Sequence, residues 1–104
     1  MERDYLEQII KECEIFNSDN TSVAVKKIQS LDERFERDNL IEIYNYILAV
    51  SQNPEILMHT IQCSDRFRDK SSLNLLLDIL LMKNINSNTE QFINVRVMCT
   101  KAIA

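Results

Sequence analysis

Glycine is missing from this 104-residue chain, and proline occurs only once. An average chain of this length contains roughly seven glycines, so the absence is informative. Glycine supplies the positive φ angles of tight β-hairpin turns and of loops that bind phosphate groups. The sequence therefore argues against β-hairpin architectures, and it excludes the P-loop and the glycine fingerprint of dinucleotide-binding folds. A helical chain tolerates this lack, because asparagine can end a helix in the left-handed conformation.

Cysteine is scarce as well, and its spacing excludes two kinds of site. Cys13, Cys63 and Cys99 lie far apart, and no Cys-x-x-Cys motif is present, so neither a zinc cluster nor a redox pair is indicated. An odd number of cysteines also fits poorly with the disulfide framework of a secreted protein. We expect each cysteine to fill a core position in a protein of the reducing cytoplasm.

Long apolar runs are absent. The first ten residues are rich in charge and lack the apolar segment of a signal peptide. The longest apolar stretch, residues 73–82, is interrupted by Asn74 and Asp78 and is shorter than the roughly 20 residues that span a bilayer. The sequence therefore predicts no membrane association.

Charge is unevenly distributed along the chain, whose net charge is −4. Residues 1–52 hold 11 acidic and 6 basic side chains, a balance of −5, whereas residues 53–104 hold 5 acidic and 6 basic ones, a balance of +1. A nucleic-acid-binding protein would normally present a basic face. An acidic half would repel phosphate and steer a basic protein partner.

The residues that are present predict one all-α domain over residues 1–104. Hydrophobic residues make up 45% of the chain, which is enough for a compact core. Apolar residues recur at helical spacing in six segments. The expected helices cover about residues 3–16, 22–36, 40–52, 54–63, 71–84 and 89–104.

Two local signals fix the expected arrangement of these helices. Asn53-Pro54 is a helix start, since Asn caps helices and Pro suits the first helical position. The segment 71–84 is apolar around almost its whole circumference, so we expect a central, buried helix there. Short connections favour three antiparallel αα-hairpins with a period of roughly 33–37 residues, in an α-solenoid or a compact bundle.

The last third of the chain resembles a HEAT-type repeat. Its first part is leucine-rich, Leu75-Leu76-Leu77-Asp78-Ile79-Leu80-Leu81, and its second part contains Val95-Arg96 followed by Cys99 and Ala102. The resemblance implies a pair of antiparallel helices that stacks on its neighbours. Cys99 stands where that family usually has alanine, and the Asp-Pro turn of the family is missing.

One cluster of carboxylates is the strongest candidate for a binding surface. It consists of Asp32, Glu33, Glu36, Asp38 and Glu42, and Arg34 and Arg37 partly neutralise it. If Tyr44 points into the core, Tyr46 is rotated by about 200° and lies on the outer face beside Glu42. An exposed tyrosine beside carboxylates is typical of an interface anchor. The predicted partner-binding residues are therefore Asp32, Glu33, Glu36, Glu42 and Tyr46, although the cluster is also compatible with an ordinary solvated helix face.

Other groupings carry weaker chemical signals. His59, the only histidine, and Cys63 lie one helical turn apart, a spacing that rarely suits a nucleophile and its base. A catalytic metal usually takes three protein ligands, which a single histidine does not provide. Phe67 lies among Arg66, Arg68 and Lys70, a small basic and aromatic patch that Asp65 and Asp69 offset. We therefore expect no catalytic residues, no metal and no cofactor.

In size, acidity and lack of catalytic motifs, the chain resembles the immunity proteins of bacterial toxin–immunity pairs, such as those of contact-dependent growth inhibition. The resemblance implies a cytoplasmic, non-catalytic inhibitor that covers the active site of a basic toxin, for example a nuclease. Its carboxylates would then stand in for the RNA phosphates that the toxin recognises. The alternatives are a small helical adaptor and a transcription regulator, but none of the expected helices is markedly basic.

Overall fold

A computed structural model describes residues 2–15, 21–83 and 90–103. These residues form α-helices and short helical turns, and they contain no β-strand. The all-α prediction is therefore confirmed. The α-helices are α1 (Arg3–Glu12), α2 (Thr21–Ser30), α3 (Arg37–Val50), α4 (Pro54–Asp65), α5 (Lys70–Asp78) and α6 (Glu90–Ile103). A 3₁₀ turn, η2 (Leu31–Glu33), follows α2, and a π-helical turn, η3 (Ile79–Lys83), follows α5.

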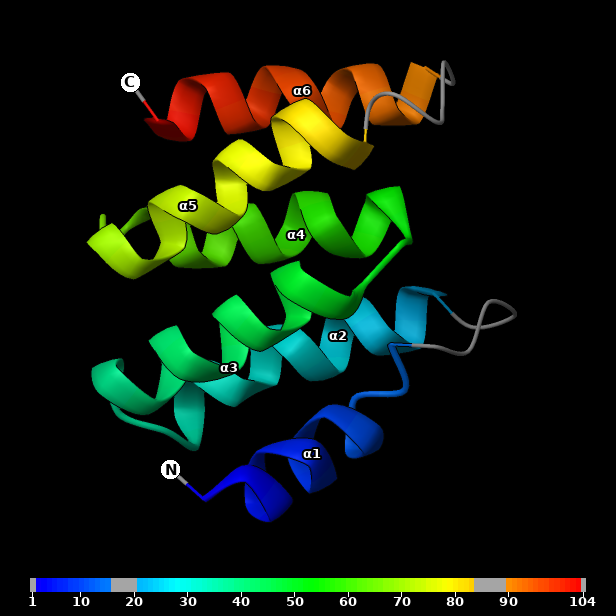
Figure 1. The fold of residues 1–104 in the computed structure, drawn as a ribbon. Helices are drawn as coiled ribbons and strands as arrows, with labels where there is room; N and C mark the ends of the chain where they lie inside the picture. The colour runs from blue at the N-terminus through cyan, green and yellow to red at the C-terminus, as the bar shows by residue number, and fades with distance from the viewer. Residues whose placement is uncertain (1, 16–20, 84–89, 104) are drawn as a thin grey trace.

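The helices lie in two layers (Figure 1). Helices α1, α3 and α5 follow one another in one layer, and α2, α4 and α6 follow one another in the other. Helix α3 also packs against α4, and α5 against α6, so that consecutive helices connect the layers. The two ends of the chain lie at opposite ends of this arrangement. Membership of a HEAT-like solenoid class stays a prediction.

The centre of the molecule is formed by α3 and α4. Ile43, Tyr44 and Ile47 of α3 and Ile56 and Leu57 of α4 each have a relative exposure of 0%. Two groups of buried side chains meet there. One group comes mainly from α1, α2 and α3, and the other comes mainly from α4, α5, η3 and α6.

The expectation that the leucine-rich segment 71–84 is the central helix is wrong. Helix α5 lies in the outer part of its layer, and only one of its sides packs against the core, through Ser72 and Leu76. Leu73 is 38% exposed, and Leu81 in the following turn is 63% exposed. An apolar circumference shows that every side of a helix tolerates burial, but neighbouring helices decide which side is buried.

The second helix ends earlier than the periodicity suggested. Helix α2 stops at Ser30, and the chain tightens into η2 before α3 begins at Arg37. Asp32 and Glu33 fall where a continued helix would end, and carboxylates are unfavourable near the negative end of the helix dipole. The hydroxyl of Ser30 donates to the carbonyl oxygen of Lys27 over 2.8 Å, which closes this last turn.

The predicted helix start at Asn53-Pro54 is confirmed. The Asn53 side-chain oxygen accepts hydrogen bonds from the backbone N–H groups of Glu55 at 2.9 Å and Ile56 at 3.3 Å. Pro54 occupies the first helical position, where its missing N–H group costs nothing. The Asn53 amide also donates to the hydroxyl of Thr21 over 3.1 Å, which ties the start of α4 to the start of α2.

A polar contact joins α3 to α5 within an otherwise aliphatic region. The buried Ser72 hydroxyl donates to the Asn45 side-chain oxygen over 2.6 Å. The Asn45 amide nitrogen donates in turn to the Ser71 hydroxyl over 2.9 Å. Asn45 therefore uses both ends of its amide group to contact two consecutive serines of α5.

Candidate functional site

The predicted acidic cluster lies on one connected stretch of surface, from η2 into α3. Asp32 and Glu33 belong to η2, Glu36 immediately precedes α3, and Glu42 lies on the outer side of α3. All four side chains are exposed. We call this surface the acidic ridge and define it as Asp32, Glu33, Glu36, Asp38 and Glu42.

Within the acidic ridge, Asp32 already has an intramolecular partner. The Arg66 guanidinium donates two hydrogen bonds to the Asp32 carboxylate, one of them 3.0 Å long between Nη1 and Oδ2. This two-pronged pairing links η2 to the residue that ends α4. The Arg66 guanidinium therefore offsets the charge of Asp32 and occupies its carboxylate oxygen atoms within the fold. Sequence spacing gave no sign of this pair, because its members are 34 residues apart.

Arg34 and Arg37, which lie within the sequence of the ridge, pair with groups other than Glu33 and Glu36. The Arg37 guanidinium lies 3.5 Å from Asp38 and 5.7 Å from the centre of the Phe67 ring. The Arg34 guanidinium lies 3.8 Å from Glu12 of α1 and 5.2 Å from the centre of the Phe35 ring. Among residues 2–15, 21–83 and 90–103, no partner forms an ion pair with Glu33 or Glu36. The negative charges of these two carboxylates are exposed at the surface.

Tyr46 does not stand freely on the outer face as predicted. Its side chain is half-buried and packs against the core group of α1, α2 and α3. Helix α3 has α1 on one side and α5 on the other, so both of its flanks are covered. The exposed stripe of α3 is narrow and contains Asp38, Glu42 and Ala49. Tyr46 lies at the edge of this stripe, where part of its ring remains accessible.

The basic and aromatic patch around Phe67 is a structural joint. The Phe67 ring stacks on the buried Tyr44 ring, with 6.4 Å between centres and 21° between planes. The Arg66 guanidinium lies 4.5 Å from the centre of the same ring. Phe67 is therefore held between α3 and the end of α4. The Phe67 ring already contacts Tyr44 and Arg66, so it is not available to stack on a base of a nucleic acid.

The Tyr44 hydroxyl lies beside the Cys63 thiol, and among the described residues it is the one buried side-chain nitrogen or oxygen atom without a hydrogen bond of standard geometry. Burial raises the pKa of this hydroxyl, and the neighbouring Cys63 thiol raises it further. Burial likewise raises the pKa of the Cys63 thiol, although the Tyr44 hydroxyl beside it acts in the opposite direction. A nucleophilic cysteine needs a lowered pKa. Cys63 is therefore poorly suited to catalysis, and no hydrogen bond connects it to the half-buried His59 in the described structure.

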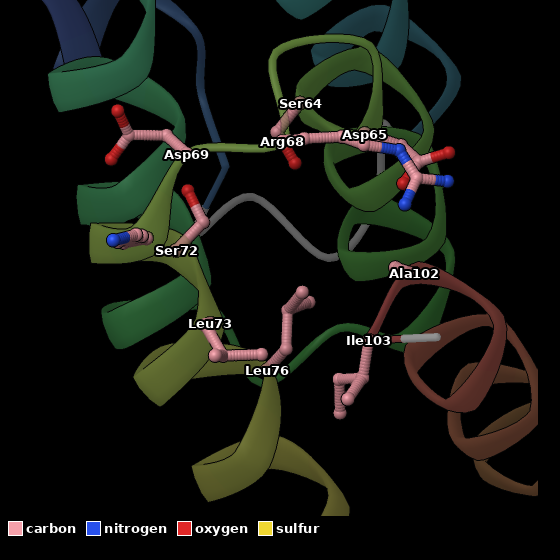
Figure 2. Close-up of a pocket in the computed structure, with 10 residues that line it drawn as sticks. Ser64, Asp65, Arg68, Asp69, Ser72, Leu73, Leu76, Ala102 and Ile103 are labelled. Carbon is pink, nitrogen blue, oxygen red and sulfur yellow. The ribbon is translucent and has the colours of Figure 1, made fainter.

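A small pocket of about 160 Å³ lies between the end of α4, the start of α5 and the end of α6. Figure 2 shows Leu76 and Ile103 at one end of the pocket and Asp65 and Arg68 at the other. The pocket is smaller than typical ligand sites, which have volumes of about 300–1,000 Å³. Its serine hydroxyls are already used, since Ser72 donates to Asn45 and Ser64 donates to the carbonyl oxygen of Ile61. The other polar side chains of its lining are charged, and Asp65, Arg68 and Lys70 among them are exposed to solvent.

In the part of the chain that the structure describes, no group of three or more His, Cys, Asp or Glu side chains is placed to hold a metal ion. Among the same residues, no helix combines the length and the apolar character needed to cross a bilayer.

Comparison with known proteins finds no match: no family model, no characterised protein and no solved structure is significantly similar to this chain.

Proposed function

We propose that this protein is a non-catalytic inhibitor that binds a basic protein partner through the acidic ridge. In its most concrete form it is an immunity protein that covers the active site of a toxin domain, such as a nuclease. The observation that carries the proposal is the open charge of Glu33 and Glu36, since the neighbouring arginines pair with Glu12, Asp38 and the phenylalanine rings. Glu42 extends the exposed negative charge along α3.

The ridge suits this task for two physical reasons. A cluster of one charge sign accelerates the encounter with a partner of opposite sign, by about 10–10³-fold at low ionic strength. Carboxylate oxygens also accept hydrogen bonds from lysine and arginine, as phosphate oxygens do, so they can occupy a cationic site that is built for RNA. Tyr46, at the edge of the ridge, adds partly accessible aromatic area to the same contact.

The cysteines support a cytoplasmic location for this inhibitor. All three are free thiols, with Cys13 and Cys99 buried and Cys63 half-buried. Burial raises the pKa of Cys13 to about 11, so this thiol stays protonated and unreactive at neutral pH. Buried, protonated thiols are the state that a reducing compartment maintains.

The proposal is tested with a charge-reversed ridge. The proposal predicts a toxin domain encoded by a neighbouring gene. That domain is produced in cells alone, with this protein, or with the E33K/E36K/E42K variant. We expect the protein to restore growth and the variant to fail. A surface-binding assay with the two purified proteins should show a binding rate that falls steeply as salt increases, because exposed charges are screened.

A second variant, E2K/E7K/D78K, controls for net charge. It carries the same change in charge on exposed residues outside the ridge. It should protect cells as the unchanged protein does, and circular dichroism should show all three proteins folded. Equal protection by the ridge variant, or the absence of any neighbouring toxin whose effect this protein reverses, would refute the proposal.

A further inference from the structure

Helix α6 is apolar on two opposite sides. Val95 and Cys99 have a relative exposure of 0% and pack against α4 and α5. Ile93 is rotated by about 200° from Val95, and Val97 by about 200° from both Val95 and Cys99, at 100° per residue. They are 50% and 46% exposed. One side of α6 thus belongs to the core, whereas the other presents aliphatic side chains to solvent.

The outward side of α6 is hollowed into a groove together with η3. Leu80 of η3 and Ile93, Val97 and Thr100 of α6 line it, and its volume is about 380 Å³. The α6 stripe from Ile93 to Thr100 is two turns long, roughly 10 Å. That length matches the apolar side of a short helix, which presents residues at positions i, i+3 or i+4, and i+7.

Two cations border this groove. Arg96 and Lys101 belong to its lining and lie on opposite flanks of the Ile93–Val97 stripe, about 60° and 80° from Ile93 around the helix. Neither side chain forms an ion pair with any residue that the structure describes. Among the described residues, no acidic side chain lines the groove. The surface is therefore an apolar strip with one unpaired positive charge on each flank.

We propose that this groove binds an amphipathic helix of a partner protein whose apolar side is flanked by Asp or Glu. The apolar strip takes the aliphatic side chains, and Arg96 and Lys101 pair with the flanking carboxylates. Such pairing across an interface selects the partner and its orientation.

Charge distinguishes this occupant from a second copy of the chain. In a symmetric dimer through α6, each copy would place its own Arg96 and Lys101 against those of the other copy. Like charges that face each other across an interface are destabilising. A head-to-tail contact with α1 offers little apolar area, because Asp4, Gln8 and Lys11 lie on its outer side. Tyr5 is the one exposed large hydrophobic residue of α1, and its ring already contacts Phe35. The inference is independent of the acidic ridge, which is a separate surface of opposite charge.

The test uses two designed peptides of about 18 residues, a length at which helices begin to be stable. Both carry leucine at positions i, i+4, i+7 and i+11, and they differ only in having glutamate or lysine on both flanks. Binding is followed by fluorescence anisotropy, and the contacted residues by amide chemical shifts. We expect the glutamate peptide to bind about tenfold more tightly than the lysine peptide and to shift the signals of α6 and η3.

Two double variants separate the groove from general electrostatics. R96E/K101E should reverse the preference, so that the lysine peptide binds more tightly. R3E/K11E, with the same charge change on the exposed face of α1, should preserve the original order. Both should keep the helical circular dichroism of the unchanged protein, because all four residues are exposed.

Three results would overturn the inference. The first is equal binding, or no binding, of the two peptides. The second is a set of shifted signals that lies outside α6 and η3. The third is a dimer, detected by light scattering, that Val97→Asp dissociates, since that result would assign the face to a second copy of this chain.

Discussion

Helices α1 and α6 lie at opposite ends of the molecule, and they expose different kinds of side chain to solvent. The exposed residues of α1 are mostly polar, among them Asp4, Glu7 and Gln8, whereas Ile9 and Ile10 turn inward. Tyr5, at 49%, is the one large hydrophobic residue of α1 that is exposed. The outward face of α6 carries Ile93 and Val97 instead. Polar side chains are well solvated, whereas neighbouring exposed aliphatic side chains favour contact with another molecule. The two ends of the molecule therefore differ in the surface that they offer to a partner.

The largest expected effect compares a fully buried site in α3 with an exposed site in η3, beside α6. Ile47→Ala at the centre of α3 should lower the free energy of unfolding by about 2–5 kcal/mol, because it leaves a cavity in a fully buried site. Leu81→Ala, on a side chain that is 63% exposed, should change it by less than about 0.5 kcal/mol. Urea denaturation followed by circular dichroism measures both values. Comparable losses would show that the leucines near α6 are covered in solution.

A smaller effect concerns an ion pair that connects the two halves of the chain. The Asp32–Arg66 pair joins η2, in the acidic half of the chain, to the end of α4 in the other half. Both side chains are nearly half exposed, at 44% and 47%, so solvent screens the interaction. A double-mutant cycle with Asp32→Ala and Arg66→Ala should give a coupling energy of about 0.5–1 kcal/mol. A coupling energy of zero would mean that the two halves do not depend on this pair.

The smallest expected effect is a pH dependence at the start of α5. The backbone N–H of Ser71 donates to Asp69 over 2.9 Å, and the Ser71 hydroxyl also donates to this carboxylate. These hydrogen bonds lower the pKa of Asp69 in the folded protein. The stabilisation is therefore present above the pKa of Asp69 in the unfolded chain, and it is lost as pH falls through the lower pKa of the folded state.

Asp69→Asn isolates this effect, because asparagine also caps helices but does not titrate in this range. The unchanged protein should be the more stable of the two at pH 7, and the difference should shrink as the pH falls below about 4. Thermal unfolding across that range measures it. A difference that stays constant with pH would contradict the assignment.

The sequence contains most of the information for the helices and less for their packing. The helix start at Asn53 was predictable, because a capping side chain and a proline act on their immediate neighbours. Helical spacing in the last segment also predicts inward positions for Val95 and Cys99, and both side chains are buried. The same spacing predicts an inward position for Phe92, whose side chain lies outside the described part of the structure.

What the sequence did not reveal depends on contacts between distant residues. Helix α5 is peripheral because of which helices pack against it, and its apolar residues are compatible with a central position as well as a peripheral one. The pairing of Asp32 with Arg66 and the half-burial of Tyr46 arise only after the layers have assembled. For the candidate site, the sequence correctly indicated exposed carboxylates but not which of them the fold would engage. The groove on α6 was missed because Ile93 and Val97 look like ordinary core residues in a helix.

Asn45 has a consequence for the uniqueness of the fold. Aliphatic side chains of α3 and α5 would pack in several alternative registers with similar energies, because dispersion forces have little directionality. The Asn45 amide accepts from Ser72 and donates to Ser71, and its two ends are not interchangeable. If α5 slid by one turn, the hydroxyl of the buried Ser72 would lose its partner, which costs about 1–3 kcal/mol. A single asparagine thus separates the native register from its competitors in energy, even though it adds little to the total stability.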